Sequence, residues 1–151
     1  MKAMDVAKYF LHKANIGGDL ITNLRLQKLL YYAQAWYLVN FDRPLFSDEI
    51  KAWRFGPVIE SVYHKFKKFR HTAIIYKSNG EIEKIFSTTD LDFLNEFYNI
   101  YIDYSANALL QMSHNEAPWK EAYESPSQII TIARMKEFYT QKYEELIGEK
   151  A

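Results

Sequence analysis

The sequence predicts a mainly α fold: a compact, single-domain bundle of about six helices around a central buried helix, with one small β-hairpin. The chain has only 5 Gly and 4 Pro in 151 residues, too few to form the many turns of a sandwich or barrel. Apolar residues recur at helical spacing along most of it. Hydrophobic residues make up 48% and aromatic residues 17% of the chain, enough for a dense core without disulfides or a metal. We therefore expect one domain over residues 1–151.

The first two helices have clear boundaries. Apolar residues at helical spacing predict a helix over 4–14, which a glycine-rich turn ends. A cap at Thr22 or Asn23 begins the next helix, which runs over 23–41. Its second half is apolar or aromatic nearly all round, as in a helix surrounded by others. We expect this helix to be the central one.

The middle of the chain is predicted to mix strand and helix. Residues 49–55 are expected to be extended or irregular. Pro57 follows a glycine and favours a helix start, so a helix is expected from there to Lys68. Asn-Gly between the β-prone runs 73–77 and 81–86 predicts the hairpin.

The second half of the chain is predicted to be helical. Thr88 or Thr89 is expected to cap a long helix that runs to about residue 102, and a further helical run covers 105–112. A short helix opens near Pro118, and the last helix runs over 131–147. No internal repeat or linker interrupts this order.

Charge and cysteine content limit the classes of function. The 19 basic residues balance 19 acidic ones, whereas nucleic-acid-binding proteins usually carry a basic excess. The chain has no cysteine, which excludes a disulfide framework, a thiolate nucleophile and a cysteine zinc site. The N-terminal segment is amphipathic rather than a signal peptide, and no apolar run approaches the roughly 18 residues of a membrane span. We expect a cytoplasmic protein that does not enter the membrane.

The sequence contains none of the common catalytic motifs, and we expect neither an enzyme nor a cofactor. Glu60 and His64 have the spacing of two metal ligands on one helix, but such a pair is more often a solvated contact, and no metal site is expected. His114 and Glu116 have the chemistry of an acid–base pair. We interpret them as helix-end residues and rank a hydrolase last.

One basic run with interleaved aromatic rings allows a nucleic-acid alternative. Phosphates would be neutralised there and bases would stack on Phe66 and Phe69. These two rings have helical spacing, however, and are expected to face the core, leaving the cations as a solvated face. The candidate phosphate contacts are Lys65, Lys67, Lys68 and Arg70.

Polar and amphipathic side chains occur on elements that are expected to be buried. Gln27, Lys28 and Gln34 lie on the central helix together with a tyrosine pair, and the run 53–55 precedes the Gly-Pro turn. One account is an internal polar network that ties the helix to this turn. The other is a half-exposed groove, because Tyr, Trp and Arg are enriched in interface hot spots.

Three segments resemble the signature of the Panacea domain family, also called SocA-like or phage-associated GepA-like. They are LQKLLYYAQ at 26–34, AWRFGPV at 52–58 and SHNEAPW at 113–119. The opening DVAKYF at 5–10 and MKEFY at 135–139 are similar to the ends of the domain. The resemblance thus extends over nearly the whole chain, with its motifs in the right order.

The resemblance implies a bacterial or phage antitoxin that neutralises a cognate protein toxin, encoded next to it, by direct binding. The alternatives are an adaptor that delivers the toxin or another protein to an ATP-dependent protease, and a nucleic-acid-binding regulator. The motif residues form either an internal network or a partner-binding surface, and the resemblance does not choose between them. They are Lys28, Tyr31, Tyr32, Trp53, Arg54, Phe55, Gly56, Pro57, His114, Glu116 and Trp119.

Overall fold

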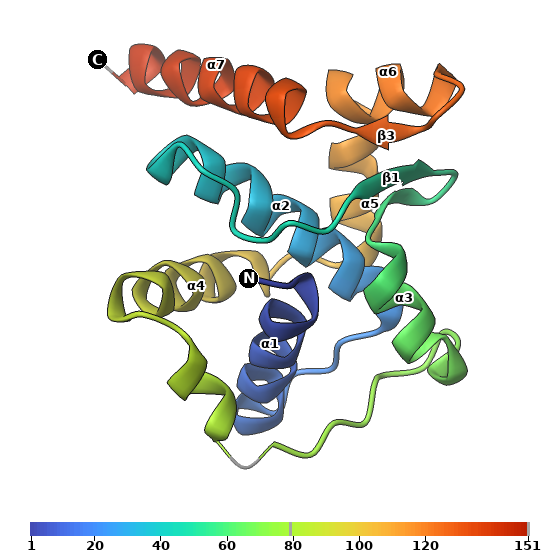
Figure 1. Ribbon diagram of the computed structural model, residues 1–151, viewed down its shortest axis with the longest axis vertical. Coiled ribbons are helices and arrows are strands. Elements are labelled where there is room, and N and C mark those ends of the chain that lie inside the picture. Colours follow the sequence, from blue (N-terminus) through green and yellow to red (C-terminus); the bar gives the residue numbers. More distant parts are fainter. Residues whose placement is uncertain (79, 151) are drawn as a thin grey trace.

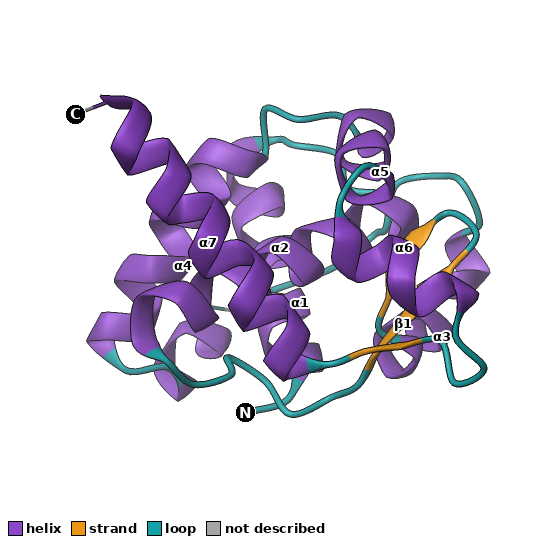
Figure 2. Cartoon of the chain, turned by 90° about the horizontal axis from the view of Figure 1, so that it is seen from above, coloured by secondary structure: helices purple, strands orange, loops and turns teal. Residues whose placement is uncertain are grey.

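A computed structural model describes residues 1–78 and 80–150. Within these residues, seven α-helices, two 3-10 helices (η) and a three-stranded antiparallel sheet form a compact, mainly α fold, which confirms the predicted class (Figures 1 and 2). The elements in order are α1 (Ala3–Gly17), α2 (Asn23–Phe41), β1 (Ile50–Trp53), β2 (Gly56–Val58), α3 (Glu60–Phe66), η1 (Lys67–Phe69), η2 (Glu81–Ile85), α4 (Thr88–Tyr101), α5 (Ala106–His114), α6 (Ala117–Glu124), β3 (Ile129–Ile130) and α7 (Ile132–Lys150).

Helix α2 is the centre of the fold. The Thr22 hydroxyl caps it by accepting a hydrogen bond from the Arg25 amide at 3.2 Å. Helices α1, α3, α4, α5 and α7 all pack against α2, and Figure 1 shows it between α7 on one side and α1 and α4 on the other. Leu26, Leu29 and Leu30 are fully buried in these contacts. The expected central helix is therefore present with its expected bounds.

The sheet joins the middle of the chain to the start of α7. Its strand order is β2-β1-β3, with Trp53 opposite Gly56 and Ile50 opposite Ile130. Arg54 and Phe55 form the turn between β1 and β2. This β1–β2 hairpin lies beside α2, α5 and α6, so helices hold it on more than one side.

The prediction of a hairpin over 73–86 was wrong. Residues 81–85 form η2, the run 74–78 forms no regular structure, and the Asn79 turn position lies outside the described residues. Ile82 of η2 and Phe86, which follows it, both pack on the core. The local Asn-Gly signal is overridden by this packing.

The expected helix start at Pro57 was also wrong. Pro57 lies in β2, an edge strand, where its missing N–H leaves no ladder position unpaired, and α3 begins only at Glu60. The later helices agree with prediction within a few residues, except that Ser87 caps α4 in place of the expected threonine. No helix in the described part of the chain is both long and apolar enough to span a bilayer.

Candidate functional site

Lys28 ties the central helix to the hairpin from inside the protein. Its side chain is fully buried, and its Nζ donates a hydrogen bond to the Pro57 carbonyl oxygen at 2.9 Å. Among the described residues, no carboxylate forms an ion pair with it. Burial penalises the charged form and lowers the pKa of Lys28 from 10.5 to about 7. The buried Lys28 side chain therefore holds strand β2 against α2.

This burial makes stability depend on pH. The unfolded chain keeps the Lys28 pKa at 10.5, whereas the folded protein lowers it to about 7. Between these values the unfolded state binds one proton more, so the free energy of unfolding rises with pH by up to ~1.4 kcal/mol per pH unit. Urea unfolding from about pH 7 to about pH 9, below the range of the tyrosines, measures this rise. Lys28→Met is expected to flatten it, and an unchanged slope in that variant would contradict the assignment.

The Glu116 carboxylate, at the junction of α5 and α6, accepts hydrogen bonds from three side chains. One carboxylate oxygen accepts from the Tyr32 hydroxyl at 2.5 Å and from the Tyr139 hydroxyl at 2.8 Å, and the other accepts from Lys142 Nζ at 2.7 Å. With its one proton on Glu116, the Tyr139 hydroxyl oxygen accepts from the Tyr31 hydroxyl at 3.0 Å. Burial raises the pKa of all three tyrosines above the ordinary value, so they stay neutral donors. This cluster joins α2, α6 and α7.

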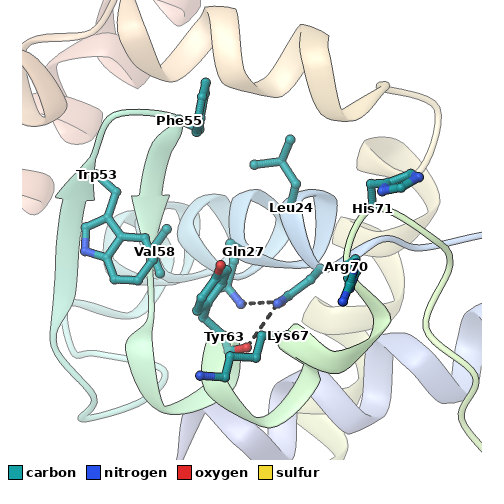
Figure 3. A pocket seen from close by; sticks show the side chains of 10 residues that line it. Leu24, Gln27, Trp53, Phe55, Val58, Tyr63, Lys67, Arg70 and His71 are labelled. Atoms are coloured by element: carbon teal, nitrogen blue, oxygen red, sulfur yellow. Dashed lines mark hydrogen bonds between the residues drawn. The ribbon is translucent and has the colours of Figure 1, made fainter.

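A second polar connection joins α2 to the start of α3. The Gln27 side-chain oxygen accepts from the Ile59 amide at 2.9 Å, and its nitrogen donates to the Asn23 side chain at 2.9 Å. Asn23 in turn donates to the Tyr63 carbonyl oxygen at 3.0 Å (Figure 3). Gln27 was named from the sequence as part of a possible internal polar network, but its partnership with Asn23 and Tyr63 was not predicted. The four-residue spacing of the Asn23 and Gln27 amides, which places them on one face of α2, is the signal that points to this pair.

Helices α5 and α6 also contact the β1–β2 hairpin and hold it in place. Trp119 Nε1 donates to the Trp53 carbonyl oxygen at 2.8 Å, and the His114 ring stacks on Trp119 with centroids 3.9 Å apart. Burial lowers the pKa of His114, and Lys28 adds to this effect, whereas a hydrogen bond to the Arg54 backbone opposes it. Among the described residues, the buried His114 Nε2 has no hydrogen-bond partner. His114 is thus a neutral ring stacked at the base of the hairpin.

The tip of the hairpin is exposed. Phe55 is 61% exposed, and the Arg54 guanidinium lies over its ring at 5.6 Å from the centroid. Trp53 is half-buried and packs edge-to-face on Tyr63, with ring centroids 4.9 Å apart. An aromatic and cationic tip therefore stands on a buried base.

The motif residues divide by exposure. The buried ones are Lys28, Tyr31, Tyr32, Gly56, Pro57 and Glu116. The half-buried ones are Trp53, His114 and Trp119, and the exposed ones are Arg54 and Phe55. The fold brings all of them to α2, the hairpin and the α5–α6 junction.

A cavity of about 270 Å³ opens beside the hairpin. Trp53, Phe55, Val58 and Tyr63 form its apolar walls, and Leu24 lies at the edge that α2 contributes (Figure 3). The rest of the lining is polar or cationic: Asn23, Gln27, Lys67, Arg70 and His71. Figure 3 shows Arg70 and His71 together at the far end from Trp53.

The predicted basic run borders this cavity. Phe66 is buried and Phe69 packs against the core, as expected. The four cations of the run are all exposed: Lys65, Lys67, Lys68 and Arg70.

Of the two residues with metal-ligand spacing, Glu60 and His64, the first pairs with a lysine. Glu60 at the start of α3 forms an ion pair with Lys51 of β1, with its Oε1 3.8 Å from Lys51 Nζ. No group of three or more potential metal ligands occurs among residues 1–78 and 80–150. Neither His64 nor Glu60 is thus part of a ligand cluster in this region.

A family comparison covers the elements that make this site. The family model for the antitoxin SocA-like, Panacea domain matches residues 26–120, from the first turn of α2 into α6. The chain belongs to the antitoxin SocA-like, Panacea domain family. The match contains the hairpin, Lys28 and Trp119, and excludes Tyr139 and Lys142 of α7. The matched residues of this Panacea domain therefore include the hairpin and both of its ties, together with α3, α4 and α5.

A curated relative is also similar. Antitoxin SocA of Caulobacter vibrioides (strain NA1000 / CB15N) is 47% identical over 64 residues, which cover 42% of this chain and 34% of that protein. The match therefore spans about a third of the relative's length. No solved structure matches this Panacea domain.

Proposed function

We propose that this chain is an antitoxin that neutralises a cognate protein toxin by direct binding in the cytoplasm, with the toxin encoded next to it. The observation that carries the proposal is membership of the antitoxin SocA-like family through the segment that builds the hairpin. Neutralisation by binding requires a surface and no catalytic group, so we infer a non-enzymatic role.

The hairpin tip is the surface that we assign to the toxin. Phe55 and Arg54 belong to the residue types that dominate interface energies, and they lie at an exposed turn. The Lys28 and Trp119 hydrogen bonds fix the strands that carry this turn. A surface that is already ordered loses little conformational entropy when a partner binds.

The motif residues then have two roles. The buried members, such as Lys28 and Glu116, hold the hairpin and the α5–α6 junction in place. The exposed members, Arg54 and Phe55, contact the toxin. This division predicts that buried variants lose folding and exposed variants lose only binding.

Co-expression with the product of the adjacent reading frame tests the proposal. The chain is expected to restore growth of cells that express this toxin, and Phe55→Ala is expected to weaken the purified complex about 30-fold, as truncation of a hot-spot ring does. Ile100→Ala is the matched control, because Ile100 is 60% exposed and lies on α4. Retained binding by Phe55→Ala with loss by Ile100→Ala would contradict the assignment of the hairpin.

Toxin abundance in the same cells separates direct neutralisation from the adaptor alternative. Direct binding predicts that growth recovers while the toxin level stays constant. If recovery requires an ATP-dependent protease and the toxin level falls, the chain acts as an adaptor that delivers the toxin to the protease, and direct neutralisation is wrong.

A further inference from the structure

The cavity beside the hairpin has the size of a receptor for one side chain. Its volume is about 270 Å³. A cavity of roughly 150 Å³ accepts benzene, whereas pockets for whole small molecules measure roughly 300–1,000 Å³. One large aromatic or branched side chain therefore fits this space better than a nucleotide or a cofactor does.

The walls of the cavity favour an apolar occupant. Trp53, Val58 and Tyr63 present rings and a branched side chain to it (Figure 3). The amides of Asn23 and Gln27 lie in the same lining but already bond to each other and to backbone groups. An inserted polar group would find these amides occupied, so apolar contact provides the gain in free energy.

The rim of the cavity favours a negative charge next to that occupant. Lys67, Arg70 and His71 line it, and the chain from 61 to 78 contains no Asp or Glu. Within the described residues, neither Lys67 nor Arg70 has a carboxylate in ion-pair range. The free cations attract carboxylates that flank the apolar anchor.

Arg70 lies at this rim in a strained backbone conformation. Its backbone φ is 52° with ψ −123°, a conformation that L-residues rarely adopt. Its amide bonds to the Lys67 carbonyl oxygen at 3.0 Å, which closes the turn after η1. Glycine at this position would relieve the strain, so Arg70→Gly removes the charge without threatening the fold.

We propose that this cavity binds one bulky apolar side chain from an acidic linear segment of the toxin. The inference rests on the proposed function and names the chemistry of the segment that the hairpin face recognises. A peptide is favoured over nucleic acid because Trp53 and Tyr63 meet edge-to-face at 73°, which leaves no flat platform for successive bases. The zero net charge of the chain also gives weak attraction for a long phosphate backbone.

Peptide display on the purified full chain tests the ligand class. Random short peptides selected on the chain are expected to enrich one Trp, Phe or Leu flanked by Asp and Glu. Lys67→Glu is expected to weaken the best peptide about tenfold or more, and Lys65→Glu about threefold or less, because Lys65 lies outside the cavity. Enrichment of sequences without carboxylates, or tighter binding of a single-stranded oligonucleotide with the same Lys67 dependence, would overturn the proposal.

Two further variants test whether the toxin binds in this cavity. Leu24→Trp fills the cavity from the edge contributed by α2, and Arg70→Gly removes its charge; both are expected to weaken the toxin complex and the peptide complex together. Ile100→Trp is the control for a bulky surface substitution. Toxin binding unaffected by both cavity variants would overturn this inference and leave the antitoxin proposal standing. Peptide binding without any toxin binding would support the ligand class and contradict the antitoxin proposal.

Discussion

Gly56→Ala is expected to lower the free energy of unfolding by roughly 3–5 kcal/mol, as the sum of backbone strain and overpacking. Gly56 has φ 101°, which disfavours any side chain. A Cβ added there would lie 2.5 Å from Lys28 Cε. Lys28 is fully buried and bonded to the Pro57 carbonyl oxygen, so a shift of its Cε away from the new Cβ would disturb that buried hydrogen bond. The glycine is required because the lysine passes directly over it.

Urea or thermal unfolding of paired variants measures this effect. Gly18 is the matched control, since its φ is 73° but no atom lies within 4 Å of an added Cβ. Gly18→Ala is expected to cost about 1 kcal/mol. In a Lys28→Ala background the clash is absent, so Gly56→Ala should then cost no more than the Gly18 variant. Equal costs for both glycines in the otherwise unchanged chain would show that Lys28 does not press on Gly56.

Glu116→Ala is expected to destabilise the fold by a similar roughly 3–5 kcal/mol. The carboxylate is nearly buried and is the acceptor for Tyr32, Tyr139 and Lys142. Its removal leaves the Tyr32 hydroxyl without a partner in a buried site and separates α2 from α7. Glu116→Gln keeps an acceptor and is expected to lose less.

Glu121 provides the matched control for this prediction. It is a carboxylate of α6 with a similarly short bond, 2.7 Å to Arg134 Nε, but its side chain is 55% exposed. Glu121→Ala should cost less than about 1 kcal/mol, as exposed ion pairs usually do. If Glu116→Ala is at least as stable as Glu121→Ala, the buried cluster is not a source of stability.

The boundaries of α2 were determined by local chemistry, whereas the start of α3 was not. The cap at Thr22 and the long apolar run after it sufficed to predict α2, because both signals act within a few residues. The hairpin was predicted at the wrong place because its cause is not local. Arg54 and Phe55 are not turn formers, and the strands they join are held by Lys28 and Trp119 from distant helices.

The candidate site shows the same division. The motif residues were named from the sequence, since the family resemblance lies in them. Their separation into a buried base and an exposed tip required the fold, because Tyr31 and Phe55 have the same aromatic character in the sequence. The cavity was not predicted, since it forms only where Leu24, Trp53 and Arg70 come together from three elements.

Hydrogen–deuterium exchange of the full chain, alone and with the toxin, tests the central claim most directly, namely that the hairpin tip and its cavity form the partner-binding face. Amides at 54–55 and 67–71 are expected to become protected in the complex, while those of the exposed face of α4 near Ile100 exchange as before. Protection confined to α4 and α7, with 54–71 unchanged, would contradict the account.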